Sequence, residues 1–449
     1  MPENMTMLYR RSILPYFLLF SILLFSIFSM PVKSLTSQFI GGIVPSIICI
    51  LLIMHLLLYQ SKYPGRFRLN KLDLPILVLL SYNVFHIFYS HISQNTFFDA
   101  LQYYRVQLLS IAIYFFVRKE LFLQEDNRKY IINILSIIYL IILIDLTVES
   151  ILRNIYGIDL SMLPWVEKMS LVEAKIFTGL GIRVPTIFGM PHKAGLLAVS
   201  SVVYYYFLFK IRGKRVYLLA TLFAIINVIL SNSYSALLIL LLIFFMLRKE
   251  KIFIKTALMF SLASVIIFSY IFSKYSQYSI SFSKIIYDGI LAYLDTFDSE
   301  KLKLIPFTDM PLWNIYNIAT YLFGTGIADS SIYGQVYDFY KMEIGLVLDV
   351  LPKQGMFFIF ILLLLLLYPI RIKTSMPDIR YLKIMLLPFY LAMLHYWITF
   401  HMGVFEIFIT LYGLLISEII NYRKRHKIMS ATETWVERGL HRKINSQPL

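Results

Sequence analysis

The chain has 449 residues, of which 59% are hydrophobic and only 15% are charged. A soluble globular domain is about half apolar and about a quarter charged, so this composition excludes one. The net charge of +16 suggests nucleic-acid binding. However, the basic residues cluster in short segments between long apolar runs, as the positive-inside rule of membrane proteins predicts. We therefore expect a polytopic membrane protein with no nucleic-acid partner.

The apolar runs are continuous and do not alternate, as in Met356–Leu367 (MFFIFILLLLLL), so they predict helices and not the strands of a barrel. We expect an all-α integral membrane protein with about twelve spans, forming one membrane domain over 1–449. The predicted spans are 13–30, 39–59, 73–92, 100–117, 130–149, 187–209, 215–231, 233–247, 252–272, 347–370, 381–399 and 403–421. Arg10 and Arg11 precede the first span and no small-residue cleavage site follows it, so we expect it to stay uncleaved.

Lysines and arginines occupy alternate connections, which predicts that both termini and the basic tail 422–449 are cytoplasmic. Two junctions, Ser231–Ser233 and Phe400–Gly403, allow only tight turns. Merging either pair of spans breaks the charge alternation, so we keep them separate. Two outer loops are long, 150–186 and 273–346, and the second is rich in aromatic and acidic residues. Such a loop suits a cap over a cavity or short helices on the membrane surface.

The first candidate site is the stretch Gly179–Gly195, which carries Arg183, His192 and Lys193. Gly189 and Pro191 mark the entry to the sixth span, because proline is tolerated in the first turn of a helix, and the N-terminus of this span is expected to face outward. Cations beside the unpaired N–H groups of a helix N-terminus form a site for an anion such as phosphate. The alternative is that the cations only extend to the membrane interface and that His192 is a solvated loop residue.

Two further groups are candidates. Arg105 follows Tyr104 near the outer end of the fourth span, where an ionisable residue usually faces a cavity or a partner. Glu343 and Asp349, with Lys341 nearby, lie where the second outer loop meets the tenth span. A carboxylate in a partly desolvated place suits a general base. The alternative for Arg105 is that its side chain only reaches to the membrane interface. The alternative for the two acids is that they lie in a solvated helix start.

Other chemistry finds no support in the sequence. Cys49 is the single cysteine, so an internal disulfide and a cysteine-based metal site are excluded. The histidines lack metal-ligand spacing, and there is no P-loop and no G-x-S-x-G sequence. We expect no metal and no cofactor.

The arrangement resembles the O-antigen polymerase and ligase superfamily, and within it the Wzy-type repeat-unit polymerases. The resemblance covers almost the whole chain as an order of spans and loops. Three local pieces carry it: the run Arg183–Gly195, the small polar turn Ser231–Ser235, and Gly324–Gly326 followed by Glu343, Gly345 and Gly355.

The resemblance implies a GT-C-like membrane fold and a metal-independent glycosyltransferase in the bacterial inner membrane. Its substrate is an oligosaccharide on undecaprenyl pyrophosphate. A chain-length regulator and a flippase are implied partners, besides membrane lipids. Glu343, or else Asp349 or His192, is expected to take the acceptor proton, and Arg183 to stabilise the leaving diphosphate. Arg105, Tyr104, Lys193 and Lys341 are expected to bind substrate.

Three alternatives stay open. Ligases of the superfamily often carry a histidine where this chain has Glu343, which favours polymerase over ligase. A flippase of the same lipid-linked sugar needs charges deep in several spans, and few are present. A non-catalytic assembly factor is the third alternative.

Overall fold

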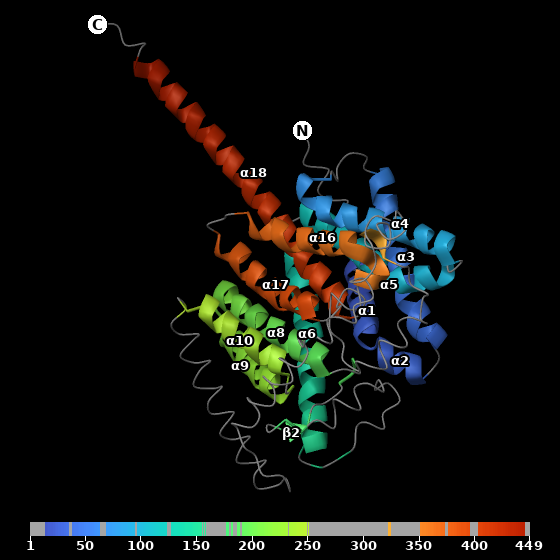
Figure 1. Ribbon diagram of the computed structural model, residues 1–449. Coiled ribbons are helices and arrows are strands. Elements are labelled where there is room, and N and C mark those ends of the chain that lie inside the picture. The colour runs from blue at the N-terminus through green and yellow to red at the C-terminus, as the bar shows by residue number, and fades with distance from the viewer. Residues whose placement is uncertain are drawn as a thin grey trace.

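The computed structural model describes residues 14–35, 38–62, 69–94, 97–123, 127–154, 156, 158, 177–178, 181–182, 186–188, 191–231, 233–248, 250, 322–324, 351–372, 376–395 and 403–444. These residues form a helical bundle with one two-stranded hairpin (Figure 1). The elements are α1 (Leu14–Ile27), α2 (Ser29–Leu35), α3 (Gln38–Lys62), the 3-10 turn η2 (Lys71–Asp73), α4 (Leu74–Gln94), α5 (Phe97–Leu123), α6 (Asn127–Asn154), β1 (Phe177–Thr178), β2 (Gly181–Ile182), α8 (Pro191–Arg212), α9 (Arg215–Leu230), α10 (Tyr234–Met246), α16 (Leu351–Ile370), α17 (Pro377–His395) and α18 (Val404–Ile444).

Five helices are long and apolar enough to cross a bilayer, which confirms the general expectation of a helical protein with membrane-crossing segments. They contain the windows Ile43–Lys62, Lys71–Ser90, Asn127–Arg153, Lys193–Arg212 and Val404–Lys424. Shorter apolar helices occupy Leu14–Ile27, Arg215–Leu230, Ser235–Met246 and Gln354–Ile370. The count of about twelve spans remains a prediction.

Each predicted span coincides with a helix, except 252–272, which lies outside the described residues. The short junctions do separate helices: α9 ends at Leu230 and α10 begins at Tyr234, while α17 ends at His395 and α18 begins at Val404. The predicted last span 403–421 coincides with the apolar window Val404–Lys424, and α18 itself runs on to Ile444 and projects beyond the other helices (Figure 1). The apolar window ends at Lys424, but no proline ends the helix there.

Two helices form the centre of the bundle. Helix α8 packs on α9 and α17, and α18 packs on α5, so both are mostly buried along their apolar windows. The contact of α18 with α5 is close because Gly413 faces Val117 and a Cβ added at Gly413 would lie 3.1 Å from the valine side chain. Small residues let neighbouring membrane helices approach in this way.

The predicted cytoplasmic end of the bundle is fixed by a buried ion pair. The Nε of Arg118 donates to Oδ1 of Asp73 at 2.8 Å, and both residues are buried. Tyr114 donates to the same oxygen at 2.6 Å, and Arg118 also donates to Ser417 Oγ at 3.3 Å. This network therefore joins η2, α5 and α18.

Charges predicted to lie on the cytoplasmic side also meet one another. Arg128 pairs with Asp378 at 3.0 Å, and Lys210 pairs with Glu250 at 2.6 Å. Burial raises the pKa of Glu250, but hydrogen bonds led by the one from Lys210 outweigh it and leave the pKa below its ordinary value. Segments distant in the chain that share a predicted side thus come together in space, as the topology requires.

Candidate functional site

Two carboxylates of α6 hold the segment that leads into α8. Glu149 Oε2 accepts the backbone N–H of Thr186 at 2.7 Å, and Asp145 Oδ2 accepts that of Ile187 at 3.1 Å. Thr186 has a positive φ of 59°, which is rare for a β-branched residue. Such an unfavourable conformation persists only where the surroundings enforce it, and here the two hydrogen bonds to carboxylates of α6 do so.

The sequence explains how α6 can do this. Asp145 and Glu149 are four residues apart, so their side chains lie on one face of the helix. The strand β2 also contacts α6, and Arg153, one turn beyond Glu149, interacts with it electrostatically. The exit of the first predicted outer loop is therefore attached to α6.

The same segment reaches across to the start of α18. Gly403 has a φ of 83°, and a Cβ added there would lie 3.0 Å from the ring of Phe188. The N–H of Gly403 donates to Oε2 of Glu406 at 2.7 Å, and Glu406 is fully buried. Arg105 on α5 interacts electrostatically with this carboxylate. A buried carboxylate, which interacts electrostatically with the partly buried Arg105, therefore lies at the turn against which Phe188 packs.

A second link joins α4 to residues 322–324 of the second predicted outer loop. His86 Nε2 lies 2.8 Å from the carbonyl oxygen of Phe323, and Tyr104 Oη lies 2.8 Å from His86 Nδ1. Because a carbonyl can only accept, Nε2 carries the proton, and Nδ1 of the neutral ring accepts from the tyrosine. Tyr89 donates to the Gly324 carbonyl at 3.2 Å. This part of the loop is therefore bound to α4.

The sequence pieces that carry the family resemblance contact one another: Gly355 lies against the segment of Gly324, and Gly195 lies against the turn at Ser231. Gly355 has a φ of 73°, and a Cβ there would overlap the carbonyl of Leu322, just before Gly324. Gly195 packs on the turn before α10, since its Cβ would lie 2.9 Å from Ser231 Oγ. Glycine is needed at Gly355 because the backbone of Leu322 approaches closely, and at Gly195 because side chains of the turn and of α10 do.

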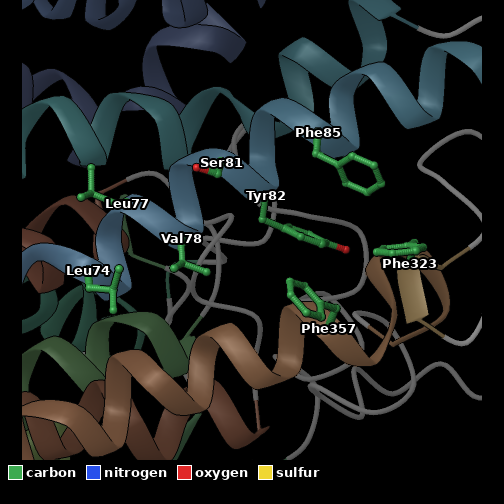
Figure 2. Close-up of a pocket in the computed structure, with 8 residues that line it drawn as sticks. All are labelled: Leu74, Leu77, Val78, Ser81, Tyr82, Phe85, Phe323 and Phe357. Atoms are coloured by element: carbon green, nitrogen blue, oxygen red, sulfur yellow. The ribbon is translucent and has the colours of Figure 1, made fainter.

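An apolar groove lies beside this region, between α4 and α16. Its volume is about 420 Å³, and its lining residues are Leu74, Leu77, Val78, Ser81, Tyr82, Phe85, Phe323 and Phe357. Figure 2 shows the aromatic rings gathered at one end and the aliphatic side chains at the other. The aromatic end includes Phe323, so the groove adjoins the bound part of the second loop.

The structure places only some of the predicted site residues. Four of them, Arg183, Lys341, Glu343 and Asp349, lie outside the described residues. His192 is the second residue of α8, and only its backbone is described. The following residue, Lys193, is buried.

The two residues on α5 are described more fully. Arg105 is partly buried near Glu406, and Tyr104 is fully buried against His86. Among the described residues, no group of three or more His, Cys, Asp or Glu side chains could hold a metal ion.

The sequence interpretation missed Glu406, gave no role to His86, and treated Asp145 and Glu149 only as polar lining near the outer end of the fifth span. Glu406 has a signal in the sequence, because it is an acid within an apolar run of α18. The other three contribute through partners distant in the chain, which periodicity does not reveal. Comparison with protein families, curated proteins and solved structures finds no match to this chain.

Proposed function

We propose that this chain is a surface-polysaccharide polymerase. It joins oligosaccharide repeat units, carried on undecaprenyl diphosphate, at the outer face of the bacterial inner membrane. One observation carries the proposal: the fully buried Glu406, with which Arg105 interacts electrostatically, lies at the turn against which Phe188 packs, and Phe188 follows Arg183 in the chain. Cations gathered at one end of a membrane bundle suit a diphosphate, because arginine matches the geometry of phosphate oxygens.

In the proposed reaction an acceptor hydroxyl attacks the anomeric carbon of the donor glycan. The bond between that carbon and the diphosphate oxygen breaks, and the electron pair leaves with the diphosphate. Arg183, Arg105 and Lys193 stabilise the charge that develops on the leaving group. Glu343 takes the proton of the hydroxyl, with Asp349 and His192 as the alternative bases. The reaction uses no metal.

The groove supports the lipid-linked form of the substrate. It opens on exposed apolar residues, among them Leu74, Phe85 and Phe357, where a membrane protein meets hydrocarbon chains. A carrier chain lying there would bring its diphosphate toward the end of α4 that carries His86. Tyr104, which contacts His86, and the next residue, Arg105, lie at the same level on α5.

Deleting the gene and analysing the surface glycan separates the proposed function from its alternatives. Loss of polymerase leaves a single repeat unit on the lipid A core. Unligated polymer on its carrier indicates a ligase instead, and repeat units trapped inside the cell indicate a flippase.

Complementation then separates an enzyme from an assembly factor. Arg183→Ala and Glu343→Gln are expected to restore protein levels but not polymer. Arg248→Ala, at an exposed position of the predicted cytoplasmic end, is the matched control and should restore polymer fully. Polymer of normal length from both site variants would refute the catalytic roles.

A further inference from the structure

Two fully buried amides lie on the neighbouring helices α4 and α5, and neither has a hydrogen-bond partner among the described residues. Asn83 and Gln107 are both 0% exposed. Among the described residues, neither the amide nitrogen nor the amide oxygen of either side chain has a hydrogen-bond partner. A buried polar group without a partner is costly, and native proteins rarely keep one without a reason.

The helix register places the two amides at the same level. His86 on α4 meets Tyr104 on α5, and Asp73 meets Arg118 at the other end, so the two helices are antiparallel. Asn83 lies three residues before His86, and Gln107 lies three residues after Tyr104. Positions three apart share a helix face, so both amides point into the same interface, one turn deeper than the His86–Tyr104 contact.

Helix α18 adds a charged group to this level. Arg118 on α5 donates to Ser417 on α18, which sets the register of these two helices. Gln107 and Glu406 each lie about three turns toward the predicted outer end from that contact. The layer of Asn83, Gln107 and Glu406 thus crosses the bundle just below Arg105.

We propose that this layer is the plane at which α4 separates from α5 and α18 during the reaction cycle. In the described state the amides have no hydrogen-bond partner among the described residues, so their burial destabilises the closed arrangement. When α4 moves away, water enters and satisfies all four amide groups, which favours the open arrangement. An all-apolar interface has no such compensation, since opening it only exposes hydrocarbon.

The movement would change the distance between the groove on α4 and Arg105 on α5, which are the two parts of the proposed site. In this respect the inference rests on the proposed function. Helix α4 carries the groove and, through His86, the bound residue Phe323. Helix α5 carries Arg105. Separation of the two helices therefore changes the distance between the seat of the carrier chain and the cation proposed to bind its diphosphate.

Apolar replacements of similar shape test the proposal. Asn83→Leu and Gln107→Met, each in the full-length protein, remove unpaired polar groups without removing a bond. Each is expected to raise the apparent Tm by about 2–4 °C. Hydrogen–deuterium exchange of α4 peptides should become slower, and polymer formation should fall about tenfold if the open population falls by that factor.

A bonded amide provides the matched control. Asn227 is equally buried, but it donates to the Phe223 carbonyl at 2.9 Å and accepts from Thr147 at 2.9 Å. Asn227→Leu should therefore lower the apparent Tm. A lower or unchanged Tm in both Asn83→Leu and Gln107→Met would overturn the proposal, because the amides would then have partners in solution.

The remaining outcomes are also decisive. A higher Tm with unchanged exchange in α4 refutes the opening. A higher Tm and slower exchange with wild-type polymer formation refutes its connection to the reaction. If the wild-type protein forms no polymer from lipid-linked repeat units, the proposed function fails, while Tm and exchange still decide whether the layer opens.

Discussion

Glu149 accepts the backbone N–H of Thr186 at 2.7 Å and so keeps a threonine at positive φ directly before α8. Glu149→Leu leaves this buried N–H without an acceptor, which costs about 1–3 kcal/mol. Glu149→Gln retains an acceptor oxygen and should cost less. The apparent Tm of the two variants, measured in one detergent, checks this order.

The two Glu149 variants also test whether this contact positions Arg183. Polymer formation should fall further in Glu149→Leu than in Glu149→Gln, because the segment after Arg183 loses its attachment to α6. Equal rates in the two variants, with the leucine variant less stable, would show that the contact serves stability alone.

Arg105 is expected to act on the leaving group. Arg105→Ala should reduce polymer formation by a factor of about 10²–10³, which is typical for the loss of one preplaced group that stabilises developing charge. Arg105→Lys keeps the charge but not the planar fork, so an intermediate rate is expected. The rate of repeat-unit joining in membranes with equal protein content is the measurement. Wild-type rates in Arg105→Ala would remove this residue from the mechanism.

Gly355 should tolerate no side chain. Its φ of 73° disfavours other residues by about 1–2 kcal/mol, and a Cβ would also overlap the Leu322 carbonyl. Gly213 has a similar φ of 66° with nothing near its Cβ position, so Gly213→Ala measures the backbone cost alone. Gly355→Ala should lower the apparent Tm more than Gly213→Ala. Equal shifts would mean that Leu322 does not pack on Gly355 in solution.

Removing one partner of the Asp73–Arg118 pair should be strongly destabilising. Asp73→Asn leaves a buried guanidinium without its counter-charge, which typically costs about 3–5 kcal/mol. Asp378→Asn breaks the more exposed contact with Arg128 and should cost about 0.2–1 kcal/mol. Urea or thermal unfolding of the two variants in detergent compares them. A small effect of Asp73→Asn would contradict the buried pair.

Glu250 makes stability sensitive to acid. Its pKa in the folded protein lies below the ordinary value of 4.5, so its stabilising effect is fully present above that pH. The effect is lost as the pH falls through the folded-state pKa, because protonation removes the pairing with Lys210. Glu250→Gln should therefore lower the Tm at neutral pH and flatten its decline in acid. An unchanged acid profile would contradict the pairing.

The helices could be predicted from the sequence because bilayer crossing demands long apolar runs, and these are visible without any tertiary information. The end of α18 could not, since a helix in water continues through polar residues until a breaker appears. Arg105 and Lys193 could be singled out as charges near apolar runs. Glu149 and Thr186 could not, because their contact joins α6 to a segment 37 positions away.

Asn83 and Gln107 show more clearly that contacts between distant segments cannot be predicted from the sequence. Each is a single amide in a largely apolar helix, and each has an ordinary appearance in the sequence. Their relationship depends on the antiparallel register of α4 and α5, which the contacts of His86 and Asp73 establish. Only the structure reveals that two buried amides share a level and that neither has a hydrogen-bond partner in the part of the chain that the structure describes.

The uninterrupted course of α18 has a mechanical consequence. Its 41 residues make a rod of about 60 Å, roughly half of which extends past the apolar window that ends at Lys424. Glu406 belongs to the first turn of this rod, and no proline interrupts it. A rotation of the helix at Glu406 therefore turns the protruding end through the same angle.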